Sequence, residues 1–358
     1  MNSVWNAPSD HDDSAALQDT VRQAYSDRTP LRIQGGASKA FLGRAVEAAT
    51  LSTTSHRGIV SYDPTELVIT ARAGTLLSEL EHALAEAGQM LPCEPPSFCG
   101  AATVGGMVAA GLSGPRRPWS GSVRDFVLGT RLITGQGEHL RFGGEVMKNV
   151  AGYDLSRLLA GSFGSLGLIT EVSLKVLPKP RCSTTLRMTI SPVEALRRLT
   201  DWGQQALPIS GACHDGKVLH LRLEGGEGSV SAARDRLGCV DADAGFWADL
   251  RDHRLAFFQS QTTLWRLSLP FNVEPLDLPG VQLLDWAGTQ RWLKSDAGSD
   301  LIRARVNEYG GHATCYSADA CDLPFQPLPH ALMRYQQRLK AHLDPHGIFN
   351  PGRLYPEL

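Results

Sequence analysis

The sequence predicts an α+β protein built from two or more lobes. With 358 residues, 42% of them hydrophobic, the chain is too long for one ordinary domain and can fill substantial cores. Residues 100–178 hold two clusters of glycines, each beside an apolar run, which is typical of backbone that passes close to a bound group. From about 183 to 324, short strand patterns alternate with helical ones, and this indicates a second lobe with an antiparallel sheet.

The composition excludes several classes of protein. A formal net charge of -2 gives no basic excess for nucleic acid or anionic lipid, so we expect no nucleic-acid partner. No apolar run reaches the roughly 18 residues of a membrane span, and the opening MNSVWNAPSDHDDS is polar and acidic where a signal peptide is basic and then apolar. We therefore expect a cytoplasmic protein that meets a membrane only through partners.

The cysteines point to neither a disulfide scaffold nor a metal cluster. There are seven, an odd number without any C-x-x-C spacing. An iron–sulfur cluster needs closely spaced thiolates, so this chain is not expected to carry one, and we predict no metal site. Most of the cysteines should be small buried hydrophobes; they are Cys93, Cys99, Cys182, Cys213, Cys239, Cys315 and Cys321.

The first elements prepare a glycine loop. Residues 14–26 predict a helix with Ser14 as its N-cap and with Leu17 and Val21 facing a core. The segment PLRIQGGASKAFLG then predicts a short strand that ends at Gly35 and Gly36. Glycines there let the backbone approach a diphosphate and donate successive N–H groups to it. Two glycines after a strand also occur at ordinary tight turns, so this pattern alone leaves both interpretations open.

The next stretch predicts a strand followed by a helix whose Leu76, Leu80, Leu84 and Ala87 form one packed face. Gly88 should end this helix. Further on, VRDFVLGTRLITGQGEHLRF predicts two strands joined by a turn at residues 135–137. Glycine clusters before and after this pair, with no catalytic dyad between them, favour a cofactor cradle.

Three segments carry a family resemblance. ATVGGMVAAGLSG, GSVRDFVLG and KNVAGYDLSRLLAGSFGSLGLITEVSLKVLP occur in this order. Together they resemble the FAD-binding domain of the vanillyl-alcohol-oxidase-like (PCMH-type) flavoproteins, which include D-lactate and glycolate dehydrogenases. The later segments LWRLSLP, DWAGTQRWL and YGGHATCY are similar to the smaller FAD-binding subunit of bacterial glycolate oxidase. The resemblance implies a two-part FAD-binding domain with an α+β cap that contains an antiparallel sheet.

The resemblance also implies where FAD binds. The first glycine loop would hold the pyrophosphate, the prolines would lie along the flavin, and the glycine clusters would complete the site. The implied residues are Gly35, Gly36, Ala37, Ser38, Lys39, Pro95, Pro96, Thr103, Val104, Gly105, Gly106, Gly111, Gly121, Ser122, Asp125, Gly164, Gly167, Ile169 and Asn350.

Two departures from the family pattern bear on the chemistry. Covalently flavinylated relatives often hold a histidine in the first glycine loop, where this chain has Ala37 and Ser38, so FAD should be bound non-covalently. Many catalytic relatives read GSEGTLG where this chain reads GSFGSLG, so Phe163 replaces an acid. The paired-histidine metal motif and Glu-His pair of catalytic caps are absent, as are the H-E-x-x-H, P-loop, G-x-S-x-G and G-x-G-x-x-G patterns.

The cap offers three candidates for substrate chemistry. Arg266 and Arg291 could bind a carboxylate, and His312 could accept a hydroxyl proton. Trp-Arg pairs are more often packing, and a lone histidine is more often structural, so the structural interpretation carries the greater weight.

Three functions remain open at this point. The chain could be the FAD-binding subunit of a multi-subunit glycolate oxidase, with a larger homologous FAD subunit, an iron–sulfur subunit and a small 2-hydroxy acid as partners. It could be a self-sufficient FAD-dependent 2-hydroxy-acid dehydrogenase, or a non-catalytic assembly subunit. The expected domains are 1–180 for FAD, divided at 58/59, then 181–324 for the cap, and 325–358 for a C-terminal helix that returns to the FAD domain.

Overall fold

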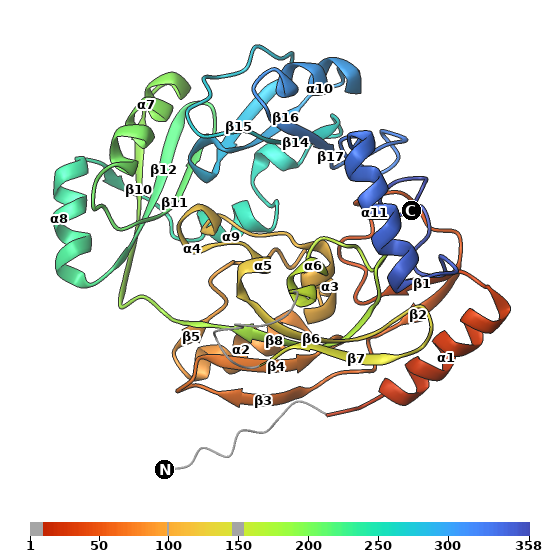
Figure 1. Cartoon of the computed structure of the whole chain (residues 1–358). Coiled ribbons are helices and arrows are strands. Elements are labelled where there is room, and N and C mark those ends of the chain that lie inside the picture. Colours follow the sequence, from red (N-terminus) through yellow and green to blue (C-terminus); the bar gives the residue numbers. More distant parts are fainter. Residues whose placement is uncertain (1–9, 99, 145–153) are drawn as a thin grey trace. The chain divides into compact units, whose positions relative to one another are not determined.

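The computed structural model describes residues 10–98, 100–144 and 154–358, and they form two compact units (Figure 1). The first unit takes the chain up to residue 113 and the ranges 122–178 and 328–358, and the second takes 114–121 and 179–327. The chain therefore passes between the units four times. Residues 114–121 fall in the range that the sequence analysis assigns to the first lobe, yet they pack with the second unit.

The centre of the first unit is an antiparallel sheet of five strands, in the order β3-β4-β8-β6-β7. Strands β6 and β7 are the predicted pair, and their turn at 135–137 is confirmed, with Gly137 at a φ of +78°. The strands are β3 (Ile59–Asp63), β4 (Val68–Arg72), β6 (Val127–Ile133), β7 (His139–Gly143) and β8 (Leu168–Lys175).

Short helices cover one face of this sheet. Leu80 of α2 and Met107 of α3 share a buried core with Ile69 and Val172 of the sheet. The elements are α2 (Leu77–Glu86), α3 (Val104–Ala110), α5 (Val123–Phe126) and α6 (Leu155–Leu158), with the small pair β5 (Gln89–Met90) and β9 (Leu177–Pro178).

The face predicted for α2 is partly wrong. Leu80 and Leu84 are buried as expected, but Leu76 is the N-cap and Ala87 is the exposed C-cap, so Leu77 and Ala83 complete the packed face. Gly88 follows with a φ of +67°, as the predicted helix end requires.

A second, smaller core holds the parallel pair β1 (Leu31–Gln34) and β2 (Ala49–Ser52). Helix α1 (Ser14–Asp27) covers this pair with Leu17 and Val21, and Phe349 near the C-terminus bridges to Leu31. Asp13 occupies the N-cap position that the sequence analysis gave to Ser14. The last helix of the unit is α11 (His330–Leu343).

The second unit contains the expected antiparallel sheet. Its order is β13-β10-β12-β11-β15-β16-β14-β17. The strands are β10 (Cys182–Thr189), β11 (Ile209–His214), β12 (Val218–Gly225), β13 (Val240–Asp241), β14 (Leu264–Ser268), β15 (Val281–Asp285), β16 (Gln290–Lys294) and β17 (His312–Cys315).

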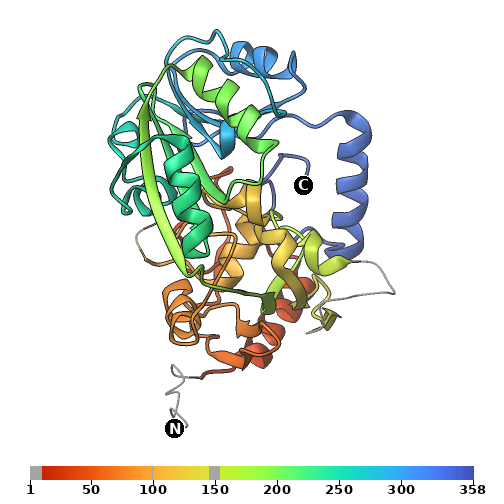
Figure 2. The same ribbon diagram turned by 90° about the vertical axis from the view of Figure 1, so that its left-hand side faces the viewer.

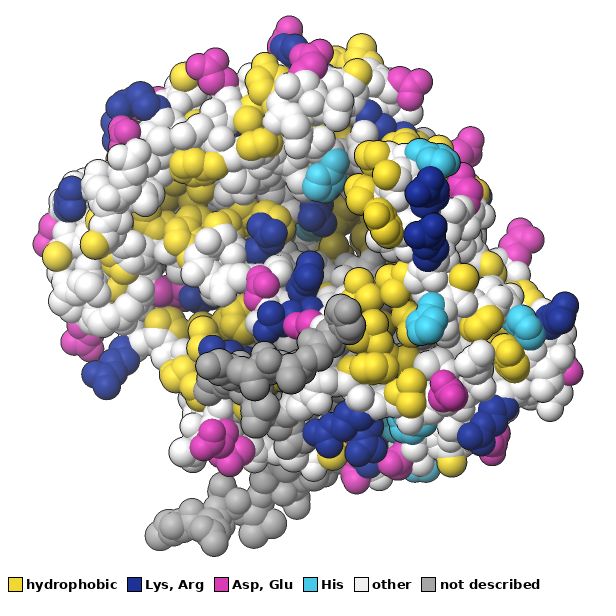
Figure 3. All heavy atoms as spheres, in the orientation of Figure 1, with side chains coloured by type: hydrophobic (Ala, Val, Ile, Leu, Met, Phe, Trp, Pro, Cys, Tyr) yellow, Lys and Arg dark blue, Asp and Glu magenta, His cyan; other side chains and the backbone are white. Residues whose placement is uncertain are grey.

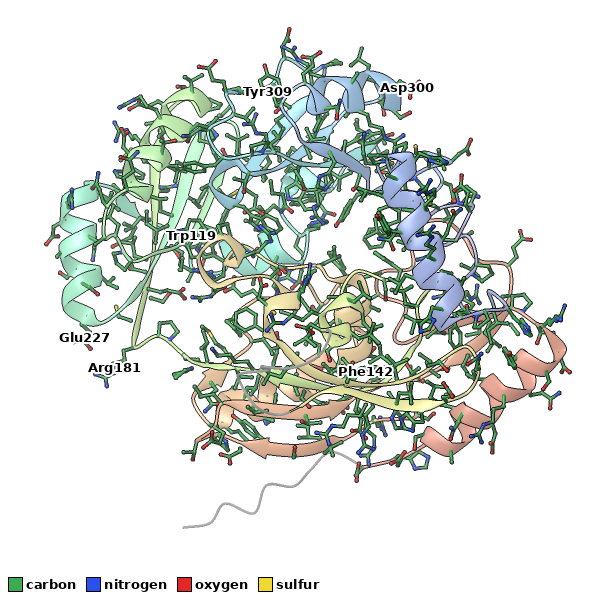
Figure 4. All side chains as sticks on the ribbon, in the orientation of Figure 1. Trp119, Phe142, Arg181, Glu227, Asp300 and Tyr309 are labelled. Atoms are coloured by element: carbon green, nitrogen blue, oxygen red, sulfur yellow. The ribbon has the colours of Figure 1, made fainter. Side chains whose placement is uncertain are left out.

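Helices cover one face of this sheet, and Figure 2 shows two of them, α7 and α8, in front of the strands. In Figure 4, Asp300 and Tyr309 mark the two ends of the third, α10, which packs on β14 and β17 through Ile302 and Val306. The bounds are α7 (Pro192–Gly203), α8 (Glu227–Leu237) and α10 (Ser299–Asn307).

The opposite face of the second sheet carries a buried ion network. Glu224 on β12 forms ion pairs with Arg116 at 2.5 Å and with Arg222 at 3.5 Å, and all three side chains are buried or nearly so. Arg116 precedes α4 (Arg117–Ser120), so this network ties the segment 114–121 to the sheet; Trp119 of α4 is labelled in Figure 4. The remaining elements are α9 (Phe246–Arg251) and the short 3-10 helices at Ala256–Phe258 and Trp286–Gly288.

Candidate functional site: a cation-lined pocket at the first glycine loop

A pocket in the first unit opens at the end of β1. It has a volume of about 270 Å³ and is lined by the whole predicted loop from Gly35 to Lys39. Ala37 has a φ of +55°, which turns the loop back on itself. Within the described residues, the N–H groups of Gly35, Gly36, Ala37 and Ser38 donate to no protein acceptor. Four successive free donors beside a pocket form a suitable receptor for an anion such as a diphosphate.

The charge of the lining supports the same interpretation. Arg32, Lys39 and Arg353 line the pocket, and no carboxylate is among the lining residues. Arg353 donates to the carbonyls of Arg44 at 2.6 Å and Ala40 at 3.0 Å, so it also holds the loop in place. Burial, and then the nearby charge of Arg32, lower the pKa of Arg353. The pocket is therefore positive and gains from a bound anion.

The glycines of the loop are required by the surrounding protein. A Cβ on Gly36 would lie 1.5 Å from the carbonyl oxygen of Ala101, and one on Gly35 would lie 2.4 Å from Oγ1 of Thr103. The close approach is thus to residues 101–103, rather than only to a phosphate as the sequence analysis supposed.

The start of α3 contributes few free hydrogen-bond donors to the pocket. Thr103 is the N-cap and lines the pocket, and its hydroxyl accepts a hydrogen bond from the Gly106 N–H at 3.3 Å. Val104 is fully buried and its N–H donates to Thr75, while the Gly105 N–H donates to Ala73. These two N–H groups already have protein partners, so they are not free donors for a cofactor, and the role of Val104 and Gly105 in FAD binding stays a prediction.

The C-terminal stretch joins the first loop to the second glycine cluster. Asn350 accepts a hydrogen bond from the Ile33 N–H at 2.8 Å and donates from Nδ2 to the Phe163 carbonyl at 2.6 Å. A Cβ on Gly164 would lie 2.7 Å from that Nδ2 atom. Asn350 therefore fixes β1 and the turn at Phe163 together at the wall of the pocket.

A buried ion pair between Lys340 and Asp344 stabilises this connection. Lys340 Nζ donates to the carbonyls of Ser165 and Phe349 at 2.8 and 2.6 Å and to the Asp344 carboxylate at 2.7 Å. Asp344 in turn accepts from the N–H groups of Ile348 and Phe349. Burial lowers the pKa of Lys340, and Asp344 opposes that effect.

A second cavity of about 70 Å³ adjoins the first through shared lining residues. Of the predicted FAD residues, it is lined by Gly35, Gly105, Gly106, Gly164, Gly167 and Ile169. Sequence reasoning missed Arg32, Arg353, Thr53 and Ala73 as lining residues, and it noted Phe163 only as a departure from the family.

Several predicted residues line neither cavity. Pro95 and Pro96 are buried, and Gly111 ends α3 with a φ of +64°. Ser122 and Asp125 form a capping box on α5, with the Ser122 N–H donating to the Asp125 carboxylate at 2.8 Å. Gly121 belongs to the second unit. The predicted residues 148–153 and Cys99 lie outside the described residues.

Three features of the described residues bear on other chemistry: the cysteines, the possible metal ligands and the length of the helices. Cys93 is fully buried, and burial raises the pKa of its thiol, so it is a poor nucleophile. The six cysteines other than Cys99 are all free thiols. Across residues 10–98, 100–144 and 154–358, no group of side chains fits a metal ion, and no helix is long and apolar enough to cross a membrane.

In the second unit, Arg266 and His312 share one face of the sheet. Arg266 on β14 pairs with Thr314 on β17, and His312 lies two residues before Thr314, so both side chains project to the same side. Arg266 donates to the Tyr316 hydroxyl at 3.0 Å and lies over the Trp286 ring. Burial, and then the charge of Arg266, lower the pKa of His312, which favours its neutral, proton-accepting form at neutral pH.

Arg291 is not available for substrate, and that prediction is wrong. Its side chain is fully buried on the opposite face of β16. The guanidinium donates to the carbonyls of Gly288, Glu274 and Val273. Burial lowers the pKa of Arg291 to about 10. Its donors stabilise a loop, which the sequence could not reveal because the acceptors are backbone atoms.

An aromatic cluster beside Arg266 was not foreseen. The His253 ring stacks on Phe258 at 4.1 Å and meets Trp292 edge-on at 4.5 Å, and Tyr316 lies next to Trp292. Burial lowers the pKa of His253 to about 3, so this histidine stays neutral. The contributing residues are scattered over more than sixty positions, and only the folded sheet brings them together.

Comparison with known proteins indicates FAD binding, as the lining of the pocket does. Residues 11–143 match the family model described as an FAD binding domain. The chain is 61% identical to the glycolate oxidase subunit GlcE of Escherichia coli K12, over 97% of this chain and 99% of that one. It is 34% identical to the glycolate oxidase subunit GlcD of Bacillus subtilis, over 38% of this chain and 29% of the relative.

Structural comparison confirms the fold. A structure of alkyldihydroxyacetonephosphate synthase superimposes with a TM-score of 0.67 at 17% identity, over 96% of this chain and 75% of the other. The predicted PCMH-type fold, with its antiparallel cap sheet, is confirmed. The chain therefore belongs to the family of FAD-binding proteins that includes the GlcE subunit of glycolate oxidase.

Proposed function

We propose that this chain is the FAD-binding subunit of a multi-subunit glycolate oxidase, which converts a 2-hydroxy acid to a 2-oxo acid. A larger homologous FAD subunit and an iron–sulfur subunit would complete the enzyme. The observation that carries the proposal is the pocket at the first glycine loop, with four free N–H donors, three cations and no carboxylate in its lining. The full-length likeness to GlcE supports the same assembly. The first unit would be the FAD domain and the second the cap.

The chain's own residues fit FAD. The N–H groups from Gly35 to Ser38 would hold the diphosphate, and Arg32 and Arg353 would balance its charge. Bound FAD supplies the acceptor for the hydride that leaves the α-carbon of the 2-hydroxy acid. Asn350 and Phe163 would fix the loop geometry on which this binding depends. The loop holds no histidine and Cys93 is buried, which supports a non-covalent cofactor. A cytoplasmic location is part of the same proposal.

A self-sufficient dehydrogenase is the second candidate. The observation in its favour is the shared face of Arg266 and His312, a cation for a carboxylate beside a neutral proton acceptor. Against it stand the hydrogen bond that Arg266 already gives to Tyr316 and the lack of the paired-histidine motif. We therefore place the main proton acceptor and carboxylate receptor in the partner subunit.

The proposal is tested by purifying the chain alone and together with the other subunits. We expect the isolated chain to show the visible absorption of oxidised flavin, and co-expression to recover a larger FAD-domain homologue and a cysteine-rich chain. A colourless chain that still assembles would support a non-catalytic assembly subunit. A chain that recovers neither subunit would contradict the multi-subunit enzyme.

A further inference from the structure

His56 is a fully buried histidine of the first unit that lines neither of the two cavities described above. Its Nδ1 atom accepts a hydrogen bond from the backbone N–H of Asp13 at 3.0 Å. Its Nε2 atom lies 3.1 Å from the carbonyl oxygen of Thr170. A carbonyl oxygen only accepts, and a backbone N–H only donates. Both contacts are therefore satisfied by one form of the ring, the neutral tautomer with its proton on Nε2.

The backbone around His56 is bonded to the wall of the second cavity. The His56 N–H donates to the Thr53 carbonyl at 3.1 Å, and the His56 carbonyl accepts from the Gly74 N–H at 2.9 Å. The Thr170 carbonyl that faces the ring also accepts from the Ala73 N–H at 2.7 Å. Thr53 and Ala73 both line the second cavity. A change in the bonds of the ring is thus passed to this wall through backbone hydrogen bonds.

On its other side, the ring holds the residues that precede α1. Asp13 is the N-cap of α1, and the Oδ1 atom of Asp12 lies 3.6 Å from Nδ1 of His56. Arg72 on β4 forms ion pairs with Asp10 and Asp12 of the same segment. In the lower part of Figure 3, charged side chains of both signs and His side chains lie next to one another at the surface. The buried ring therefore belongs to a network whose rim meets solvent.

The groups that face the ring favour its neutral form in sum. Burial lowers the pKa of His56 and outweighs the carboxylates that raise it, which lie before α1 and on β8; they are Asp12, Glu171 and Asp13. His139 on β7 meets the Oγ1 atom of Thr170 at 2.9 Å. Burial, and then the charge of Arg131, lower the pKa of His139 as well. Near neutral pH, the ring of His56 thus keeps the single proton that its two contacts require.

A second proton on His56 would break this arrangement. It would lie on Nδ1 and point at the Asp13 N–H, so that two donors would face each other across 3.0 Å. A buried donor without an acceptor is costly. The Asp12 carboxylate could accept from the new N–H, but only after the ring or the segment has moved to shorten the present 3.6 Å. Protonation therefore displaces either the start of α1 or the ring.

We propose that His56 is a positioning residue for FAD: its neutral form holds Thr53 and Ala73 in place at the wall of the second cavity, and its protonation weakens cofactor binding. This inference rests on the proposed function, since it takes the two adjoining cavities as the FAD site. The coupling is reciprocal, so bound FAD must lower the pKa of His56 by the same factor by which protonation weakens FAD binding.

The first test follows the ring itself in the full chain, with and without FAD. NMR of isotope-labelled histidine reports both the tautomer of His56 and the pH at which it takes up its second proton. We expect the Nε2–H tautomer, and a midpoint about one pH unit lower in the FAD-loaded chain, which corresponds to about a tenfold change in affinity. An Nδ1–H tautomer, or equal midpoints with and without FAD, would overturn the proposal, because a purely structural histidine does not respond to the cofactor.

The second test removes the titrating ring. His56→Gln keeps an N–H donor for the Thr170 carbonyl but cannot take up a proton. As the pH falls below 6.5 and through the lowered pKa of His56, the Kd for FAD should rise about tenfold in the wild type and change less than about twofold in this variant. Flavin fluorescence measures the release. His82→Gln is the matched control, because His82 is exposed on α2 and its loss should leave the wild-type profile unchanged.

A further variant keeps the ring and changes its charge environment. Asp12→Asn should move the wild-type midpoint to lower pH, because the Asp12 carboxylate raises the pKa of His56. This variant and the NMR titration decide the matter even where His56→Gln does not fold. A flat wild-type profile, or the wild-type profile in His56→Gln, would overturn the positioning role while leaving the FAD site intact. A wild-type chain that binds no FAD at neutral pH would contradict the proposed function itself.

Discussion

At the scale of single residues, Gly36 shows how the pocket is built. Its backbone lies so close to residue 101 that any Cβ would overlap the Ala101 carbonyl oxygen. This contact fixes the loop in the course that leaves its N–H groups free. Protein packing and cofactor binding thus impose the same requirement at one position.

Gly36→Ala should therefore reduce FAD retention by more than tenfold, because the loop must move to relieve the overlap. Gly228→Ala is the matched control, since a Cβ there meets nothing within 4 Å. The flavin-to-protein absorbance ratio measures the effect, and circular dichroism checks that both variants are folded. Full flavin content in Gly36→Ala would show that the loop assignment is wrong.

The cofactor should leave the chain on denaturation. Ala37 and Ser38 stand where a flavinylating histidine would be, and Cys93 has a raised thiol pKa in a fully buried position. Acid precipitation should give a colourless pellet and a yellow supernatant. A washed pellet that stays yellow would establish a covalent link.

Some residues of the site could be predicted and others could not. The loop from Gly35 to Lys39 follows a short strand, so local pattern and family resemblance were sufficient to find it. Arg353 lines the same pocket from more than 300 residues away, and nothing local marks it. Arg291 was misjudged for the same reason, since its backbone acceptors are visible only in the fold.

At the scale of elements, one short pattern has a structural role that the sequence did not reveal. Ser122 and Asp125 were expected in the FAD site, and in the structure the sequence SVRD from Ser122 forms a capping box that starts α5. Serine and aspartate at this spacing suit both roles, so only the structure distinguishes them. Helix and strand positions were more predictable, because their periodicity is local.

The ion network that joins α4 to the cap sheet should control the acid stability of the second unit. Burial alone would raise the pKa of Glu224, but Arg222 and Arg116 outweigh it, and the pKa is lowered from 4.5. A carboxyl with a lower pKa in the folded chain stabilises the fold above about pH 4.5, and that contribution is lost as the pH falls through the folded value.

Glu224→Gln should then cost roughly 3–5 kcal/mol at neutral pH, because it leaves two buried guanidinium groups without their carboxylate. The cost should shrink as the pH falls below 4.5 and through the lowered pKa of Glu224, where the wild type becomes protonated as well. Glu308→Gln is the control, because the exposed ion pair of Glu308 with Arg305 should contribute little to stability. Denaturant unfolding at several pH values measures both, and an equal cost at pH 3 and pH 7 would contradict the network's role.

At the scale of the whole molecule, the candidate cofactor pocket and the candidate substrate residues lie in different units. The pocket lies wholly within the first unit, whereas the substrate candidates Arg266 and His312 lie in the second. Arg266 is already bonded to a tyrosine, and His312 is a single histidine. Together they give little support for oxidation by the isolated chain. We therefore propose that this chain is necessary for the enzyme and insufficient by itself.

The most direct test is steady-state oxidation of glycolate with an artificial electron acceptor, measured for the isolated, flavin-loaded chain and for the assembled complex. The account predicts turnover by the complex, none above background by the isolated chain, and loss of turnover from the complex when this chain is omitted. Steady turnover of glycolate or D-lactate by the isolated chain, abolished by His312→Ala, would contradict it and establish a self-sufficient dehydrogenase.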